Sequence, residues 1–187
     1  MRFVVVFDAC VLYPAPLRDF LLRLATTGLF AAKWTERIHE EWIGNLLASR
    51  PELKEQVART RQLMDQAIPD CLVAGYEPLI SGLTLPDAND RHVLAATIRA
   101  SAQMIVTFNL KDFPQEFLEP FGIEAIHPDV FVECQLELNQ GLVIAAAKRH
   151  RAALKKPAKS PEEYLETLAA QGLVVTADRL REFKDLI

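Results

Sequence analysis

Acidic and amide side chains gather beside two apolar runs in the middle of the sequence. The stretch LPDANDRHVLAATIRASAQMIVTFNLKDFP contains Asp87, Asp90, Asn109 and Asp112. Another aspartate, Asp8, follows the apolar run VVVF near the N-terminus. Oxygen ligands of this kind suit hard divalent cations such as Mg²⁺ and Mn²⁺, which keep several waters and bind few carboxylates together with a substrate phosphate. These residues therefore indicate metal-assisted hydrolysis of a phosphodiester.

Each acid also has a simpler interpretation when it is taken alone. Asp87 or Asp90 could cap a helix, and Asp112 could be an exposed turn residue. Glu40 and Glu41, in the segment TERIHEEWIGNLLASRP, could add favourable charge near a helix N-terminus. An acid that ends a buried strand, as Asp8 does, is harder to explain by packing. Only the joint placement of these acids indicates a common pocket.

The pattern of apolar residues predicts an α/β fold that would bring these acids together. Short β-branched runs at residues 3–7, 29–34, 104–109 and 122–128 alternate with segments of helical periodicity, and residues 71–75 predict a further short strand. Such alternation predicts a mainly parallel central sheet wrapped by helices. In parallel sheets the functional groups gather at the carboxyl ends of the strands, where Asp8 and Asn109 stand.

The pattern changes after Pro128, where it becomes helical to the end of the sequence. We expect a long apolar helix from about residue 130 to 151, the hinge KKPAKSP, a short helix that starts at Ser160 and stops at Gly172, and a last helix from residue 176. The sequence therefore predicts an α/β domain at residues 1–130, which carries the acids, and a helical C-terminal extension at residues 131–187.

Composition limits the class of protein. Half of the 187 residues are apolar, which is enough for a sizeable core. Cys10, Cys71 and Cys134 are an odd, widely spaced set, which is typical of reduced, packed thiols rather than of disulfides or a zinc site. The N-terminal apolar run is too short for a signal peptide, and no later run is long enough to span a membrane. We expect a soluble, cytoplasmic protein.

The distribution of charge is uneven. The formal net charge of -4 argues mildly against nonspecific attraction to nucleic acid. However, the run KRHRAALKKPAK at residues 148–159 has six lysines and arginines and no acid. This run could meet a phosphodiester backbone. A solvated helix end that leads into a linker is the commoner explanation.

Several stretches resemble the PIN-domain superfamily, and specifically the bacterial VapC-like toxins. They are VVVFDACVLYP, TERIHEEWIGNL, LPDANDRHVLAATIRASAQMIVTFNLKDFP and FGIEAIHPDVFV, and they span residues 3 to about 132. The resemblance implies a PIN-like α/β/α sandwich and an acidic site for Mg²⁺ or Mn²⁺. It also implies cleavage of single-stranded RNA, a cognate antitoxin protein and a homodimer.

Residue by residue, the resemblance assigns the catalytic acids to Asp8, Glu41, Asp90 and Asp112, with Asp8, Asp90 and Asp112 as metal ligands. Glu40 competes with Glu41, because adjacent helical residues point about 100° apart and only one of them can face the site. We favour Glu41, because it lies beside the apolar face of its helix.

Other residues have supporting roles in this interpretation. Asn109 stands where many relatives have an acid, which would reduce the charge of the pocket. Thr107 could donate a hydrogen bond to a ligand carboxylate, and Asp87 could support the site. Arg91 and Lys111 could hold substrate phosphates, although exposed charges that flank a site are commonly only solvated.

Three functions compete. The first is a metal-dependent endoribonuclease, the toxin of a type II toxin–antitoxin pair, which would leave a 5′ phosphate and a 3′ hydroxyl as the resemblance implies. The second is a catalytically weak PIN module that regulates by binding RNA or protein, a hypothesis that rests on Asn109. The third is a phosphotransferase or phosphatase with Asp8 as nucleophile. That chemistry expects a second Asp two residues later, where this chain has Cys10.

Overall fold

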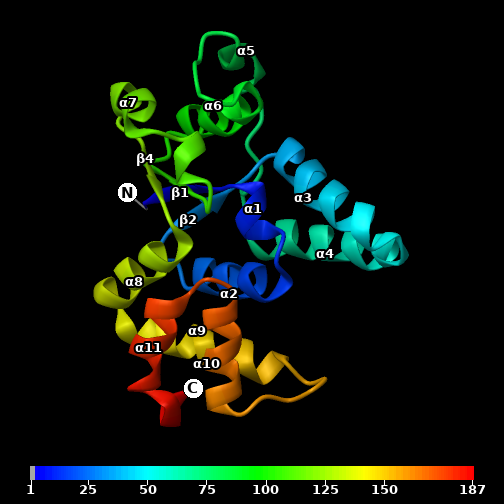
Figure 1. Ribbon diagram of the computed structural model, residues 1–187, viewed down its shortest axis with the longest axis vertical. Helices are drawn as coiled ribbons and strands as arrows, with labels where there is room; N and C mark the ends of the chain where they lie inside the picture. Colours follow the sequence, from blue (N-terminus) through cyan, green and yellow to red (C-terminus); the bar gives the residue numbers. More distant parts are fainter. Residues whose placement is uncertain (1–2) are drawn as a thin grey trace.

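A parallel sheet lies at the centre of the protein (Figure 1). The computed structural model describes residues 3–187, so the first two residues of the predicted N-terminal domain lie outside it. Within the described residues the sheet has the strand order β2-β1-β3-β4. The strands are β1 Val4–Phe7, β2 Ala31–Lys33, β3 Met104–Val106 and β4 Glu124–Ile126. All neighbouring strands are parallel, as the alternation of strand and helix predicts.

The register between β1 and β3 places the two strand ends side by side. Phe7 pairs with Val106, and Val5, Val6 and Phe7 are fully buried. A strand with neighbours on both edges and helices on both faces needs apolar residues throughout, which explains the run of β-branched residues. The residues that follow, Asp8 and Thr107, therefore leave the sheet at the same edge.

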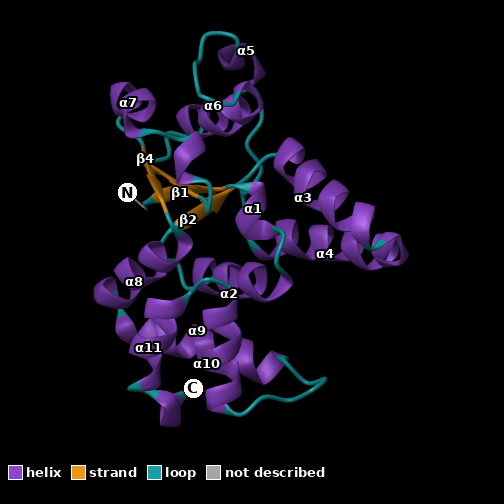
Figure 2. Cartoon of the chain, viewed as in Figure 1, coloured by secondary structure: helices purple, strands orange, loops and turns teal. Residues whose placement is uncertain are grey.

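Helices cover both faces of the sheet (Figure 2). Helix α6, Arg91–Arg99, packs on β1 and β3, whereas α2, Ala15–Ala25, contacts β2 from the other side. The remaining helices are α1 Ala9–Leu12, α3 Glu36–Ser49, α4 Lys54–Ala67, α5 Glu77–Ile80, α7 Gln115–Leu118, α8 Pro128–Leu138, α9 Gln140–Ala153, α10 Pro161–Ala170 and α11 Val174–Arg181. The α/β/α sandwich with a C-terminal helical segment is confirmed. No helix in residues 3–187 is long and apolar enough to cross a bilayer.

Two expected elements differ in the structure. The long helix expected from about residue 130 to 151 is two helices, because Asn139 has φ −157° and ψ 87° and its side chain accepts a hydrogen bond from the Leu142 amide at 3.1 Å. An asparagine in this role caps the following helix. The strand expected at residues 71–75 is reduced to one bridge between Trp34 and Leu72. It lies beyond the end of β2, and within residues 3–187 it has no second strand partner.

The C-terminal helices are attached to the rest of the protein by buried polar contacts. Asp129 on α8 is 7% exposed, and its carboxylate accepts hydrogen bonds from the amides of Val175 and Thr176, both at 2.9 Å. These amides belong to the first turn of α11, where backbone donors lack helical partners. Asp129 therefore caps α11 from a different helix.

His150 forms a second attachment. Its ring is fully buried and stacks on Phe20 of α2 at a centroid distance of 5.7 Å. The Nδ1 atom of the ring shares a hydrogen bond with the Tyr164 hydroxyl of α10 at 3.1 Å. Burial lowers the pKa of His150 to about 4, so the ring is neutral at pH 7. A neutral ring can join α2, α9 and α10 without leaving a charge in the core. The boundary at residue 130 stays a prediction.

A third contact reaches the loop after β3. Gly172 follows α10 with φ +84°, and a Cβ atom at this position would lie 3.1 Å from Cε1 of Phe108. Phe108 also packs edge-on against His127, with a centroid distance of 5.1 Å. The turn after α10 therefore lies against the residue that immediately follows Thr107.

Replacement of Asp129 by Ala tests the cap on α11. We expect the free energy of unfolding to fall by about 2 kcal/mol, because two buried amides lose a charged acceptor. Urea unfolding measures this loss, and hydrogen exchange should show faster exchange at the amides of Val175 and Thr176. Glu166→Ala, which removes an exposed carboxylate from α10, is the control. Equal stability and unchanged exchange in the Asp129 variant would contradict the cap.

Candidate active site

A cavity of about 740 Å³ opens at the carboxyl ends of β1 and β3. Its lining side chains are acids, amides and small or uncharged groups. They are Asp8, Ala9, Cys10, Tyr13, Glu41, Asn45, Asn89, Asp90 and Asn109. The cavity thus collects residues from α1, α3, the start of α6 and the loop after β3.

Asp8 is the most deeply placed acid in this cavity, with 6% of its surface exposed. Its Oδ1 accepts a hydrogen bond from the Ala9 amide at 2.7 Å, which caps α1. Its Oδ2 accepts a hydrogen bond from the Thr107 hydroxyl at 2.7 Å and is contacted by the Cys10 thiol at 3.1 Å. These donors fix the carboxylate in one orientation. The predicted contact of Thr107 with a site carboxylate is present.

Cys10 connects the two strand ends. Its sulfur lies 3.3 Å from the Thr107 hydroxyl and accepts a hydrogen bond from the Phe108 amide at 3.3 Å. Burial, followed by the negative charge of Asp8, raises the pKa of the Cys10 thiol to about 12. A neutral thiol is a poor nucleophile, so Cys10 is a hydrogen-bonding residue here. Of the other cysteines, Cys71 is buried, but Cys134 is exposed rather than packed.

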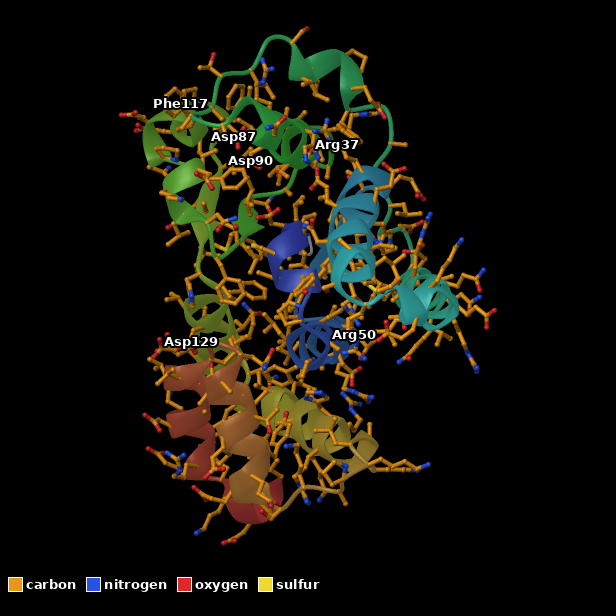
Figure 3. The ribbon with its side chains drawn as sticks, turned by 45° about the vertical axis from the view of Figure 1, so that its right-hand side comes forward. Arg37, Arg50, Asp87, Asp90, Phe117 and Asp129 are labelled. Carbon is orange, nitrogen blue, oxygen red and sulfur yellow. The ribbon has the colours of Figure 1, made fainter. Side chains whose placement is uncertain are left out.

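Glu41 lines the cavity, whereas the adjacent Glu40 is exposed and does not. The Glu41 Oε1 atom lies 2.8 Å from Nε2 of His92 and 3.3 Å from Nε of Arg37. His92 is only 1% exposed, and its Nδ1 has no hydrogen-bond partner among the described residues. Among the described residues, the polar contact of the His92 ring is therefore the one that Nε2 makes with Glu41. Figure 3 shows Arg37 on α3 beside the segment with Asp87 and Asp90.

Helix α3 is held in place on its other side by a buried histidine. His39 lies 2.9 Å from Asp65 of α4 through Nε2, and it accepts a hydrogen bond from the Trp42 indole at Nδ1 at 3.0 Å. Burial lowers the pKa of His39, which keeps the ring neutral. Arg18 covers the Trp42 ring at 4.5 Å. This packing fixes the face of α3 that turns Glu41 toward the cavity.

Asp90 precedes α6 and has no hydrogen bond to its side chain within the described residues. Its pKa is raised to about 6 by burial first, and then by the charges of Asp8, Asp87 and Asp112. His92 opposes this shift. The four aspartates therefore share one electrostatic environment, although they come from distant parts of the chain.

Not every predicted residue lines the cavity. Asp87 is exposed and caps the short turn Ala88–Asp90 by accepting a hydrogen bond from the Asn89 amide at 2.8 Å. Asp112 is half-buried but lies outside the lining. Neither Arg91 nor Lys111 lines the cavity. Arg91 donates a hydrogen bond to the Ala88 carbonyl at 2.9 Å, and Lys111 is exposed. Asn109 does line it.

Known proteins match most of this chain. The PIN domain family matches residues 4–111. A protein described as "Putative ribonuclease VapC50" from Mycobacterium tuberculosis (strain ATCC 25618 / H37Rv) is 35% identical over 123 residues, which are 66% of this chain and 72% of that protein. This chain belongs to the PIN-domain superfamily. The family VapC50 C-terminal domain matches residues 128–182 of this PIN-domain protein, and no solved structure matches it.

Sequence reasoning missed some residues of this PIN-domain cavity. Asn45 follows Glu41 by one helical turn, and this spacing could have placed it on the same face. Asn89 stands next to Asp90 in the sequence. The contact of His92 with Glu41 has no signal in the spacing, because the two residues are on different helices.

The raised pKa of Asp90 predicts that stability depends on pH. The folded protein keeps the proton of Asp90 up to about pH 6, whereas the unfolded chain loses it near 3.8. Between these values the folded state binds more protons, so the contribution of Asp90 to stability falls as pH rises. We expect the free energy of unfolding of the wild type to decline across this range relative to Asp90→Asn.

Urea unfolding at several pH values in EDTA measures this difference. Asp185→Asn, which changes an exposed carboxylate, is the control and should follow the wild type. Parallel stability curves for the wild type and Asp90→Asn between pH 4 and 6 would contradict the assignment.

Proposed function

We propose that this chain is a metal-dependent endoribonuclease that cleaves single-stranded RNA, and that it is the toxin of a type II toxin–antitoxin pair. The observation that carries the proposal is that Asp8, Glu41 and Asp90 meet in one cavity at the carboxyl ends of parallel strands. The name of the similar mycobacterial protein supports the reaction class. The family supports an antitoxin partner, a homodimer and a cytoplasmic location as further parts of this proposal.

The donor set fits Mg²⁺ or Mn²⁺. Among residues 3–187, no three side chains of His, Cys, Asp or Glu converge tightly enough to ligate one ion by themselves. Mg²⁺ usually keeps several waters and takes only one or two carboxylates. Asp8 and Asp90 can supply these, with the amide oxygen of Asn109 on the same wall. When bound, such an ion would acidify a water and offset the phosphate charge.

The residues of this chain would then have distinct roles. Asp8, held by Thr107, presents a fixed carboxylate, and Asp90 faces it without a donor of its own. Glu41, held by His92 and Arg37, faces the same space and can orient a water. We assign Asp112 to the outer boundary of the site, where its charge adds to the attraction for the ion.

A catalytically weak regulatory PIN module is the second candidate. The specific observation in its favour is that Asn109 lines the cavity as a neutral amide, so this wall has less negative charge than an acid would supply. Such a module would bind RNA or protein in the same place without cleaving it.

Metal-dependent cleavage tests the proposal. Single-stranded and structured RNAs are incubated with the purified protein and Mg²⁺ or Mn²⁺. We expect Asp8→Asn, Asp90→Asn and Glu41→Gln to lower the rate by about a hundredfold or more, and EDTA to abolish cleavage. Glu40→Gln is the matched control, because it makes the same change on the exposed neighbour and should retain the wild-type rate. Equal activity in all folded variants would exclude catalysis in this cavity.

His92 provides a separate prediction about Glu41. His92→Leu removes the polar ring atom that lies 2.8 Å from Glu41, and residues that orient active-site ligands typically contribute about 10–100-fold to activity or metal affinity. We expect a fall in kcat and in Mg²⁺ affinity with little change in KM for RNA. His92→Gln, which can place an amide near the position of Nε2, should recover part of the loss. Identical kinetics for the two variants would show that the polar contact with Glu41 has no role.

A further inference from the structure

The described part of the active-site cavity lacks positive charge. Among residues 3–187, no lysine or arginine lines it. Two arginines close to its lining residues already have partners, because Arg37 contacts Glu41 and Arg91 donates to the Ala88 carbonyl. An RNA strand brings one negative charge per nucleotide, and its affinity depends on cations that neutralise phosphates. A longer substrate therefore needs positive charge elsewhere on this acidic protein.

The acid-free run after the middle of α9 offers such charge. Lys148 and Arg149 on α9, and Lys155 and Lys156 in the following loop, are exposed. These four residues, which we call the basic strip, form no salt bridge within residues 3–187. Arg151 does not belong to the strip, because it donates to the carbonyls of Lys159 and Ile187. Figure 1 shows the loop after α9 extending away from the other helices.

A second cavity, of about 610 Å³, lies between α2, α4 and α9. Its lining includes Arg149 of the strip, Arg18, and Arg23, which pairs with the lining acid Asp19 at 3.3 Å; its apolar lining includes Leu22, Leu63, Met64 and Leu154. Leu63 is 54% exposed. The exposed Arg149 beside apolar lining suits a nucleotide, because the phosphate can pair with the guanidinium while the base covers apolar surface.

Chain continuity connects this cavity to both the active site and the strip. Tyr13 lines the active-site cavity, and Ala15, two residues later, lines the second cavity. At the other end, Leu154 lines the second cavity and also a small cavity with Lys155 and Lys156. The active-site cavity, the second cavity and the small cavity are therefore connected in this order by residues that they share or that are near neighbours in the sequence.

We propose that the basic strip and the second cavity form an additional RNA-binding site that holds substrate phosphates outside the cleaved linkage. This inference rests on the proposed function, since it takes RNA as the substrate. It predicts that the C-terminal segment selects single-stranded RNA long enough to reach from the active-site cavity to the strip. An acidic peptide is also negatively charged, so the experiment must distinguish binding of RNA from binding of an acidic peptide.

Binding is measured first, with Asp8→Asn protein so that no cleavage intervenes. Fluorescence anisotropy follows single-stranded RNAs of about 4 and about 16 nucleotides over a range of salt concentrations. We compare the parent with Lys148→Glu/Arg149→Glu and with Lys155→Glu/Lys156→Glu. For the long RNA, each lost phosphate contact should reduce the slope of log affinity against log salt by about 0.7. The short RNA should bind all proteins equally.

Arg99→Glu is the matched control, because it reverses an exposed charge at the end of α6, far from α9 in Figure 1. It should leave both RNAs unaffected. An unchanged salt slope in both strip variants, or the same loss in Arg99→Glu, would overturn the proposal. Binding of a poly-glutamate peptide through the strip, without any effect of the strip variants on RNA, would assign the surface to an acidic protein partner instead.

Kinetics then separate this proposal from the proposed function. In the otherwise wild-type enzyme, the strip variants should raise KM for the long RNA roughly tenfold and leave kcat unchanged, with normal cleavage of the short RNA. Strip-dependent binding without any cleavage by the wild type would reject the nuclease and keep the RNA-binding site. Cleavage of long RNA with an unchanged KM in both strip variants would reject the RNA-binding site and keep the nuclease.

Discussion

The parallel pairing of β1 with β3 is the constraint on which the rest of the structure depends. Because Phe7 pairs with Val106, the chain leaves both strands at one edge, and the Asp8 amide donates to the Val106 carbonyl at 3.1 Å. Asp8 and Thr107 then meet at hydrogen-bonding distance across the sheet. A register shift by one residue would reverse the side-chain directions of a strand and remove this contact. The deepest acid of the cavity is thus positioned by backbone pairing.

The other carboxylates are arranged around that fixed acid in a way that separates their electrostatic roles. Asp8 and Glu41 each have specific donors, so their charges are held in defined positions. Asp90 has none, and its pKa is raised by burial first and then by the charges of its neighbours. The unfavourable electrostatic energy of the cavity is therefore concentrated on one residue. A cation placed beside Asp90 would relieve it, which is the physical link between the charge pattern and the proposed metal.

The sequence predicted features that depend on local pattern or on sheet topology. Runs such as VVVF identified the strands, and the rule that parallel strands gather functional groups at their carboxyl ends brought Asp8, Asp90 and Asn109 to one cavity, as found. The apolar face of α3 favoured Glu41 over Glu40, and the structure places Glu41 in the lining. Whether these residues act in catalysis stays a prediction.

Features that depend on contacts between distant side chains were not predictable. The close contact between His92 and Glu41 joins two helices whose relative rotation is set by packing, and no local pattern encodes it. The break at Asn139 was hidden because apolar residues continue on both sides of it. Asp112 follows β3 closely in sequence, but the short turn Leu110–Asp112 directs it outside the lining.

The contact between Gly172 and Phe108 bears on how such proteins can evolve. The ring of Phe108 fills the space that any side chain at position 172 would need, while its backbone amide supports Cys10 beside Asp8. Recombination that replaced the C-terminal helices with those of a relative would bring in a new partner for this ring. The first and last parts of the chain would therefore have to be inherited together, or change in step at these two positions.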